Sequence, residues 1–567
     1  MNQRKWQIRK VNRGCLKHLA GSLCSPISIA RVLMNRGIIT PNQARSFLDP
    51  DLSSLDSLRS LPNLRKAVSL IDAVIKGNGK ILIFGDYDAD GLTACAILFL
   101  FLKKITPYVD TYIPSRFHEG YGLSEKAVEN IIKMNPDLVI TVDAGIKDVK
   151  GVSILKNKGI KIIITDHHVP HPEERPDADV LVSTWDWNDK KIILPLSGAG
   201  VALALAHEYA IYRGMAHSPI EEYISLACVG TVGDVVPLLD ENRVIVKYGL
   251  KKINQNPGCG LQALLEVVGF SNKDIQSEQI GYIIAPRLNA AGRVEDPRAA
   301  FELLISDNYH DALQQAKLLN EYNQKRQKEE TKVFSSLIED KNNQEAMKDE
   351  IVVVSGKNWS IGVLGIIASR LSERLLRPVI VLSENDSVAV GSARSILGFN
   401  ITDSLEKVSS LLIRYGGHEM AAGLKISLDN LDTFRQQLNE LFGERVKMLK
   451  EKNGIVVDAQ VTMADIDSQL ILWLKKLEPF GEKNPNPLFV SSDVIVNERW
   501  YSGKNRQRLE LVLMQNNKMR QHRIDAMIRS ENVSDLASSS LIDLIFEVRK
   551  GYWEQPYLKI MDWRIKK

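Results

Sequence analysis

A short stretch, KILIFGDYDADG at residues 80–91, constrains the fold more than any other part of the chain. Four apolar residues run without alternation into Gly85, and acids follow at Asp86, Asp88 and Asp90. An unbroken apolar run of this length is typical of a strand buried on both faces of a parallel sheet, and open α/β sheets place their ligand site at the carboxyl ends of such strands. Three carboxylates this close repel one another unless a cation lies among them. The stretch therefore predicts a buried strand followed by an acidic loop that binds a divalent metal.

The same pattern recurs in three later segments, each of which ends in an acid or a histidine. The predicted strands at 138–142 and 160–165 and the helix-like segment at 224–232 lead into Asp143, Asp166, His167, His168 and Asp234. Strands that alternate with helices through short connections predict a parallel, doubly wound α/β sheet, in which the carboxyl ends of neighbouring strands lie side by side. We therefore expect these residues to converge with the first three acids, although they are far apart in the sequence.

The residue types of this set favour metal catalysis. The alternative, that an acid only caps a helix or lies in a solvated loop, is the better explanation of any one acid but not of the whole set. Asp86, Asp88, Asp90, Asp143 and Asp234 carry five negative charges, which two divalent ions nearly balance. Two ions about 3.5–4 Å apart can clamp a phosphodiester for in-line attack by water. Oxygen ligands with an imidazole suit Mn²⁺ or Mg²⁺ better than Zn²⁺.

The composition excludes several classes of protein. With 44% apolar and 25% charged residues and a net charge of +4, the chain resembles an ordinary globular protein. Its five cysteines form no CxxC pair, which favours a reducing compartment over a disulfide framework or a zinc ribbon. The sequence contains neither an apolar run of about 18–20 residues nor a signal-peptide core. We therefore expect a cytoplasmic protein that does not enter a membrane.

Changes in pattern along the 567 residues divide the chain into five segments. We predict an N-terminal helical lead-in over 1–60, a catalytic α/β domain over 61–260, a connecting helical region over 261–345, a smaller α/β domain over 346–446 and an OB-like β-barrel over 453–567. The connecting region ends in a charged helix from Asp311 to about Asp340, which is expected of a solvated connector. Short strands at regular spacing favour the barrel.

Basic and aromatic residues cluster in the last of these segments. They are Arg499, Trp500, Tyr501, Lys504, Arg506, Arg508, Lys518, Arg520 and Arg523. Such a cluster suits a stacking groove for single-stranded nucleic acid. A solvated basic face with Trp500 in the barrel core is an equally good explanation.

The motifs of the catalytic segment resemble those of the DHH phosphoesterase family. They are DYDADG at 86–91, VDAG at 142–145, DHH at 166–168 and GDVVPL at 233–238. GGH at 416–418 is similar to the signature of the companion domain of that family, DHHA1. The motif order, APRLNAAGR at 285–293 and a C-terminal barrel make the chain similar to the single-strand-specific 5′→3′ DNA exonucleases of the family, over about residues 60–560.

The resemblance implies roles for the predicted site. The metal ligands would be Asp86, Asp88, Asp143, His167 and Asp234, with Asp143 as the bridge between two ions. Asp90 and Asp166 would hold the loop and the imidazole in place, and His168 would face the phosphate and could protonate the leaving oxygen.

The resemblance also implies phosphate-binding residues. Arg394 and His418 match phosphate-gripping positions, and the backbone of Gly416 and Gly417 can approach a phosphate closely. Further along the strand, phosphates could be held by Arg287, Asn289 and Arg293. For these three, an interdomain structural network is an equally good explanation.

We therefore expect a two-metal, Mn²⁺- or Mg²⁺-dependent exonuclease that digests single-stranded DNA in repair and recombination. One alternative is a DHH phosphoesterase for short oligonucleotides or cyclic dinucleotides, although the connector, the barrel and the lead-in have little use for a small substrate. A second alternative, a non-catalytic single-strand-binding scaffold, would require lost ligands, and every motif position is filled. The resemblance further implies a monomer that works with a single-strand-binding protein and a RecQ-type helicase.

Overall fold

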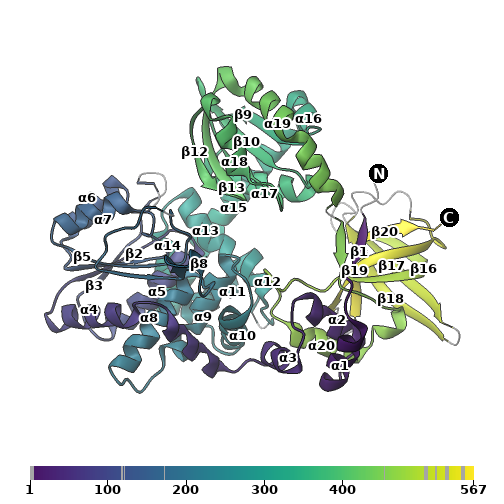
Figure 1. The fold of residues 1–567 in the computed structure, drawn as a ribbon, viewed down its shortest axis with the longest axis horizontal. Helices are drawn as coiled ribbons and strands as arrows, with labels where there is room; N and C mark the ends of the chain where they lie inside the picture. The colour runs from purple at the N-terminus through teal and green to yellow at the C-terminus, as the bar shows by residue number, and fades with distance from the viewer. Residues whose placement is uncertain are drawn as a thin grey trace.

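The computed structural model describes residues 5–115, 119–120, 122–171, 173–271, 273–452, 454–502, 508–517, 520–529, 536–550 and 556–566. Figure 1 shows a large α/β domain, a smaller α/β domain above it, and a β-barrel to the right with the N-terminal helices beside it. This arrangement confirms the predicted fold class. Within these residues, no helix has both the length and the apolar composition needed to cross a membrane.

The large domain is built on a five-stranded sheet in which every neighbouring pair is parallel. In spatial order the strands are β3 (Val109–Tyr112), β2 (Ile81–Gly85), β4 (Leu138–Val142), β5 (Lys161–Asp166) and β6 (Val180–Ser183). Every residue of β2 and β4 is buried. Because helices cover both faces, these strands are continuous apolar runs. The parallel order places the carboxyl ends of β2, β4 and β5 side by side.

Two groups of helices cover the two faces of this sheet. The domain contains α4 (Leu64–Lys76), α5 (Ala89–Lys103), α6 (Glu125–Met134), α7 (Val149–Asn157), α8 (Gly198–Tyr212), α9 (Pro219–Gly233) and a small hairpin of β7 (Trp185–Asp186) and β8 (Lys191–Ile192). Ile81 and Ile83 share a core with α4, α5, α8 and α9, whereas Leu82 and Phe84 share one with α6 and α7. Alternate side chains of a strand point to opposite faces, which explains this division.

A run of helices continues from the catalytic domain to the smaller domain. Its members are α10 (Asp240–Gln255), α11 (Cys259–Val267), α12 (Ser277–Gln279), the π-helical turn η2 (Ile280–Ile284), α13 (Ala285–Val294), α14 (Arg298–Ile305), α15 (Tyr309–Glu339) and α16 (Lys341–Ala346). The sequence predicts a solvated connector here, but α15 buries Ala316 and Leu319 in the catalytic core and Val333 and Leu337 in the core of the smaller domain. The helix α15 therefore joins the two cores.

The smaller α/β domain holds a mixed five-stranded sheet. In spatial order its strands are β12 (Leu412–His418), β13 (Ala421–Ser427), β11 (Val388–Arg394), β10 (Val379–Asn385) and β9 (Val352–Lys357), and its helices are α17 (Ile361–Leu375), α18 (Ile401–Lys407) and α19 (Leu431–Lys452). The strands β9 and β10 are parallel, and the other pairs are antiparallel. The hairpin of β12 and β13 carries His418 at its turn, and Figure 1 shows this hairpin above the catalytic domain.

The C-terminal sheet closes into a barrel. Around it lie β16 (Phe489–Ser502), β17 (Arg508–Asn517), β18 (Arg520–Arg529), β20 (Pro556–Ile565) and β19 (Leu541–Lys550), and β19 pairs back with β16. Closure leaves no unpaired edge among these strands. The sequence predicts two short strands at 488–490 and 494–496, which the structure joins into the bulged strand β16, and it predicts no strand where β18 lies. The many polar residues of β18 obscure the alternation of polar and apolar residues by which a strand is predicted.

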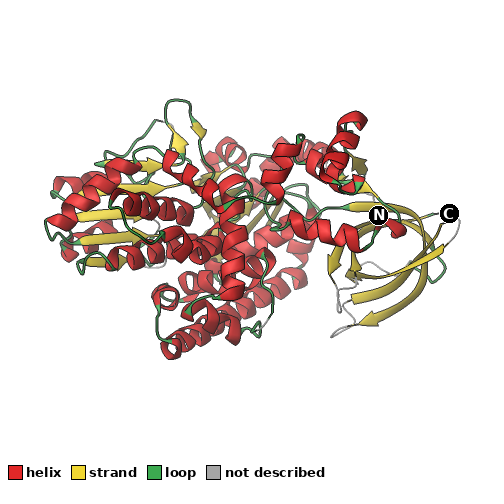
Figure 2. Cartoon of the chain, turned by 90° about the horizontal axis from the view of Figure 1, so that it is seen from below, coloured by secondary structure: helices red, strands yellow, loops and turns green. Residues whose placement is uncertain are grey.

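The N-terminal helices share one apolar core with this barrel. They are α1 (Arg13–Leu23), α2 (Ile27–Asn35) and α3 (Pro41–Leu48), and they pack with α20 (Ser468–Leu477). The 3₁₀ segment η1 (Leu52–Ser60), which follows them, buries Leu55 and Leu58 in the core of the catalytic domain instead. Leu19 and Leu33 are buried in the same cluster as Phe489 and Leu544. At the edge, β1 (Trp6–Ile8) pairs with β14 (Ile455–Val457), which precedes β15 (Ala459–Gln460). Figure 2 shows that the two ends of the described chain both lie at the barrel.

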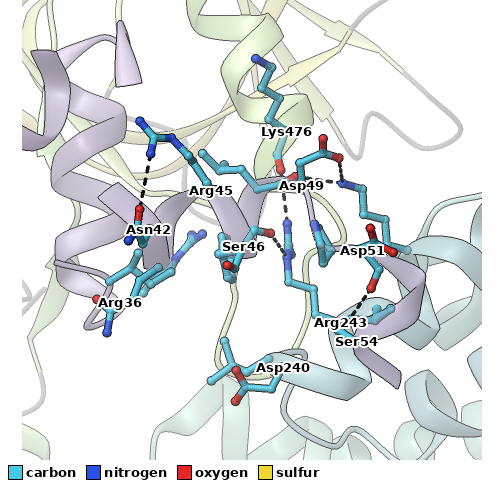
Figure 3. Close-up of a pocket in the computed structure, with 18 of the residues that line it drawn as sticks. Arg36, Asn42, Arg45, Ser46, Asp49, Asp51, Ser54, Asp240, Arg243 and Lys476 are labelled. Atoms are coloured by element: carbon cyan, nitrogen blue, oxygen red, sulfur yellow. Dashed lines mark hydrogen bonds and ion pairs between the residues drawn. The ribbon is translucent and has the colours of Figure 1, made fainter. Parts of the chain in front are cut away.

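Arg243 of α10 joins this N-terminal and barrel module to the catalytic domain (Figure 3). Its guanidinium lies 3.8 Å from the ring centroid of Phe47 and donates to the carbonyl oxygens of Phe47 at 2.6 Å, Glu478 at 2.8 Å and Lys476 at 3.2 Å. Burial and the positive charge of Arg36 lower the pKa of Arg243 to about 9. Arg36, Phe47, Arg243 and Lys476 line a cavity of about 1570 Å³, to which none of the predicted metal ligands contributes.

Candidate active site

The acids and histidines predicted to converge lie together at the carboxyl edge of the parallel sheet. Their ligand atoms form three overlapping groups, each within 4.8 Å: Asp86, Asp88 and Asp143; Asp90, His167 and Asp234; and Asp143, His167 and His168. Asp86, Asp88 and Asp90 follow β2, Asp143 follows β4, the two histidines follow β5, and Asp234 follows α9. The strand order therefore brings them together. Because Asp143 and His167 each belong to two groups, the geometry suits two neighbouring ions.

Two buried atoms of this cluster indicate that it is built for a cation. Asp143 Oδ1 and His167 Nε2 have no hydrogen-bond partner among the described residues, although they lie 3.0 Å apart. Burial and the charge of neighbouring Asp90 raise the pKa of Asp143 well above its usual range, and burial and Asp90 raise that of Asp234 to about 7. Buried polar atoms rarely stay unpaired, and crowded carboxylates resist ionisation. An Mn²⁺ or Mg²⁺ ion would satisfy these atoms, so the residues fit the metal that the sequence predicts.

The loop after β2 is shaped by its own acids. Asp88 caps α5, because its Oδ1 accepts the backbone N–H groups of Asp90 at 3.0 Å and Gly91 at 3.1 Å. An N-cap of this kind holds the loop and leaves the second carboxylate oxygen for a metal. A Cβ on Gly91 would lie 2.6 Å from the carbonyl oxygen of Asp86, so glycine is required where the helix crosses the strand end. The helix cap and the close packing at Gly91 therefore position Asp88 and Asp86.

Asp90 holds the start of α8 rather than facing open solvent. Its two carboxylate oxygens accept the N–H groups of Gly198 at 2.6 Å and Ala199 at 2.9 Å, and Oδ2 lies 3.8 Å from His167 Nε2. Burial raises the pKa of Asp90. This agrees with a positioning role for Asp90, and direct participation in catalysis stays a prediction.

Asp143 follows β4 in an unusual backbone conformation. Its φ of +57° is in the left-handed region, which aspartate tolerates better than most residues. A Cβ on Gly198 would lie 2.5 Å from Asp143 Cβ, so any larger residue at 198 would displace this carboxylate. Gly198 lies outside the motifs that carry the predicted site. Its one sequence signal is the small-residue run SGAG at 197–200, which opens an apolar helix.

Asp166 and His168 form an oriented pair. Asp166 Oδ1 lies 2.8 Å from His168 Nδ1, and Asp166 Oδ2 accepts the N–H of Ile146 at 3.0 Å. Burial opposes both charges, but their hydrogen bond and mutual attraction prevail, so the pKa of Asp166 falls to about 2 and that of His168 rises to about 9. Since Nδ1 is engaged, Nε2 of His168 is the nitrogen that is left to meet a substrate.

The smaller domain contributes a basic edge. Arg394 donates through Nε to Ser369 Oγ at 3.1 Å and through Nη1 to Ala393 O at 2.8 Å. Desolvation of the His418 ring, followed by the charges of Lys147, Arg394 and His168, lowers the pKa of His418. The hairpin therefore lies near His168 of the catalytic domain. A Cβ on Gly416 would meet open space, so Gly416 leaves room for a phosphate, whereas Gly417 is needed by its own hairpin because a Cβ there would collide with Ala421 O.

The three polar residues of α13 make contacts within the protein. Asn289 Oδ1 accepts the N–H of Ala89 at 2.7 Å, which attaches α13 to the acidic stretch 86–90 that follows β2. Arg293 Nη1 donates to Gly362 O of the smaller domain at 3.3 Å, and Arg287 donates to Asn320 Oδ1 at 3.0 Å. These contacts favour the interdomain network over phosphate binding. Binding of DNA by these side chains stays a prediction.

The basic cluster of the barrel is described in part. Trp500 and Tyr501 on β16 are 47% and 46% exposed, so Trp500 does not lie in the barrel core. Arg499 donates to the carbonyl oxygen of Leu536. Lys504, Arg506 and Lys518, and the side chains of Arg508, Arg520 and Arg523, lie outside the described residues. Successive side chains of a strand point to opposite faces, so these two exposed rings do not form one surface, but either ring could stack with a base of a single strand.

The raised pKa values of the metal-free cluster predict that Mn²⁺ binds more tightly as the pH rises. Asp234, whose pKa is raised to about 7, holds a proton in this range that a metal must displace. The apparent Kd should therefore fall about tenfold per pH unit for each displaced proton, between about pH 6 and 7. Calorimetric titrations in buffers of different ionisation enthalpy would count the protons released. A Kd that does not change over this range would contradict the assignment.

Three family models match the chain. They are the DHH family, N-terminal domain over residues 80–231, the DHHA1 domain over residues 348–444, and the RecJ OB domain over residues 457–560. The single-stranded-DNA-specific exonuclease RecJ of Bacillus subtilis is 33% identical over 566 residues, which cover 98% of this chain and 70% of that protein. The protein of the same name from Escherichia coli is 31% identical over 487 residues, which cover 82% of this chain and 83% of that protein.

Solved structures give the same result. The crystal structure of RecJ from Thermus thermophilus in complex with Mn²⁺ has a TM-score of 0.83 and 27% identity, and the match covers 100% of this chain and 80% of that chain. The Mg²⁺ complex from the same organism has a TM-score of 0.76 and 26% identity, and the match covers 99% of this chain and 79% of that chain. The similarity therefore extends over the two α/β domains and the barrel.

Proposed function

This chain belongs to the RecJ family of single-stranded-DNA-specific exonucleases, and we propose that it hydrolyses single-stranded DNA from the 5′ end with two Mn²⁺ or Mg²⁺ ions. The observation that carries the proposal is the cluster of overlapping ligand groups around Asp143 and His167, which faces the basic hairpin of the smaller domain. Acidic ligands on one side and phosphate-binding groups on the other suit a phosphodiester held between them.

The metal ligands in this proposal are those of the sequence analysis. Asp86, Asp88, Asp143, His167 and Asp234 would hold the ions, and Asp143, which belongs to two of the three groups, could serve both. When bound, two divalent ions supply Lewis-acid activation of water and neutralise charge that develops on the phosphate. Asp90 supports the cluster through its hydrogen bonds to the start of α8.

The remaining residues bind the substrate and move a proton. Asp166 holds His168 through Nδ1, and the pKa of His168, raised to about 9, keeps its imidazole protonated at neutral pH. His168 Nε2 can therefore donate a proton to the leaving oxygen. Arg394, His418 and the backbone at Gly416 would hold a phosphate of the strand from the opposite side.

We also propose the wider setting that the family implies. The protein would act in the cytoplasm in DNA repair and recombination, as a monomer that receives its strand from a RecQ-type helicase and a single-strand-binding protein. The barrel, which matches the RecJ OB domain and exposes Trp500 and Tyr501, supports a contact with single-stranded DNA outside the active site.

The proposal is tested with a strand of a few tens of nucleotides labelled at its 3′ end. With Mn²⁺ we expect a ladder of shortening labelled fragments, no cleavage in EDTA, and protection when the 5′ end is paired. Immediate release of a labelled mononucleotide would reverse the polarity. An intact strand together with hydrolysis of a dinucleotide would instead favour the small-substrate phosphoesterase.

A further inference from the structure

The guanidinium of Arg394 is held against the helix α17. Arg394 is the last residue of β11, and its Nε donates to Ser369 Oγ at 3.1 Å. The same hydroxyl donates to Gly365 O, four residues earlier in α17, at 3.0 Å. Arg394 Nη1 donates to the carbonyl oxygen of Ala393 at 2.8 Å. Because a hydroxyl can donate one hydrogen bond and accept another, Ser369 connects the guanidinium to the backbone of the helix.

Gly365 leaves room for this guanidinium. A Cβ on Gly365 would lie 3.1 Å from Arg394 Nη2, 3.7 Å from Arg394 Cζ and 3.4 Å from Ser392 Oγ, so its nearest neighbours are all side-chain atoms of β11. The residue lies inside α17, where alanine is more favourable than glycine. The space that Arg394 occupies therefore explains the glycine, whereas the backbone of the helix does not.

The helix that carries these two residues is also packed on the catalytic domain. At its start, a Cβ on Gly362 would lie 2.8 Å from Arg293 O, and Arg293 Nη1 donates to Gly362 O at 3.3 Å. Arg293 belongs to α13, which Asn289 attaches to the acidic stretch that follows β2. The orientation that α17 gives to Arg394 is therefore fixed relative to the predicted metal ligands, and not only within the smaller domain.

We propose that Ser369 and Gly365 are positioning residues for Arg394, which they orient toward a phosphate of the single strand. The proposal rests on the proposed function, in which Arg394 holds a phosphate, and adds to it the two residues that set the direction of this guanidinium. A free arginine side chain loses much rotamer freedom when it binds, whereas one that is already held loses less. The contacts with α17 should therefore increase the affinity for the strand without touching it.

The first test measures equilibrium binding of a labelled single strand to the full chain in EDTA. Ser369→Ala removes the acceptor of Arg394 Nε, and we expect binding about five- to tenfold weaker. Ser369→Thr keeps the hydroxyl and should restore the affinity of the wild type. Ser69→Ala on α4 is the matched control, because Ser69 Oγ also donates to a carbonyl oxygen four residues earlier, that of Arg65 at 2.9 Å. This variant should bind as the wild type does.

Gly365→Ala separates positioning from stability. Alanine should raise the unfolding temperature of the smaller domain because it favours the helix, while its Cβ displaces Arg394 and weakens binding of the strand several-fold. A loss of stability could not produce this combination. Gly443→Ala on α19 is the control, since a Cβ there would meet its nearest neighbour at 3.9 Å. It should raise the unfolding temperature and keep the affinity of the wild type.

A double-mutant cycle tests whether the two residues act through Arg394. Arg394→Ala should weaken binding by itself, because it removes the group that holds the phosphate. When Ser369→Ala or Gly365→Ala is added to Arg394→Ala, binding should weaken no further, since neither residue then has a guanidinium to orient. The same binding measurement gives the four affinities of each cycle.

The other outcomes overturn separate parts of the argument. Wild-type affinity of Ser369→Ala and Gly365→Ala, together with weak binding by Arg394→Ala, would overturn the positioning role alone. Additive losses in the double variants would also overturn it, because the residues of α17 would then act apart from Arg394. Wild-type binding by Arg394→Ala would overturn the phosphate contact and this inference with it. If the wild type fails to cut the strand with Mn²⁺ but the cycle is non-additive, the proposed function fails and the positioning role stands.

Discussion

Substitution of Asp143 by asparagine is expected to lower the rate of single-strand cleavage by about a thousandfold or more. Asp143 is 2% exposed and belongs to two of the three ligand groups, so the loss of its charge weakens both metal positions together. Asparagine tolerates the φ of +57° at this position, so the variant keeps the backbone. The measurement is the initial rate on the 3′-labelled strand at saturating Mn²⁺.

The same substitution should make the metal-free protein more stable. Burial and the charges of Asp90 and Asp88 raise the pKa of Asp143, which means that its ionised form is unfavourable in the folded protein without metal. A carboxyl group with a raised pKa destabilises the fold as the pH rises above the pKa of the unfolded chain, and asparagine removes this effect. We expect a higher unfolding temperature for the variant in EDTA at neutral pH and a smaller increase on addition of Mn²⁺. Differential scanning calorimetry in both conditions measures the two values.

Asp110→Asn is the matched control for both effects. Asp110 is exposed on β3 in the same domain and belongs to none of the three ligand groups. This variant should keep the wild-type rate and the wild-type response to Mn²⁺. Cleavage by Asp143→Asn at a rate close to that of Asp110→Asn would remove Asp143 from the metal site.

Substitution of Arg243 by alanine is expected to lower the free energy of unfolding of the N-terminal and barrel module by about 3–5 kcal/mol. Arg243 is 1% exposed, and its guanidinium donates to carbonyl oxygens of Phe47, Lys476 and Glu478, which would lose their donor inside the protein. The loss of its contact with the Phe47 ring adds to the effect. Urea unfolding followed by tryptophan fluorescence measures the change, with the transitions analysed separately because a chain of several domains does not unfold in one step.

Arg45→Ala is the control for this prediction. Arg45 lines the same cavity but is exposed and points away from Arg243 (Figure 3). Its removal should change the free energy of unfolding by less than about 0.5 kcal/mol. Arg243→Ala should also keep the Mn²⁺ affinity of the wild type, because no metal ligand lines this cavity. Equal urea midpoints for the two variants would contradict the proposed junction.

The catalytic sheet and its ligand cluster could be predicted because each part leaves a local pattern. The strands β2, β4 and β5 are mainly apolar runs. Each is followed directly by a predicted ligand: Asp86 after β2, Asp143 after β4 and His167 after β5. Parallel order then brings the ends together without further information. The roles of the individual side chains were harder to predict from the sequence. That Asp90 would bind Gly198 and Ala199 depends on a helix that begins more than a hundred positions later.

The sequence by itself determined the order of the two α/β domains and the barrel and the identity of the clustered acids and histidines, since buried strands and their polar ends are encoded by neighbouring residues. The tertiary structure decided which distant parts share a core. It placed the helices of residues 13–48 on the barrel, joined α15 to two cores, and brought the guanidinium of Arg243 to the carbonyl oxygens of Phe47 and Glu478. Such partners are selected by burial of apolar area and by charge between segments far apart in the chain, and neither leaves a periodic pattern in the sequence of one segment.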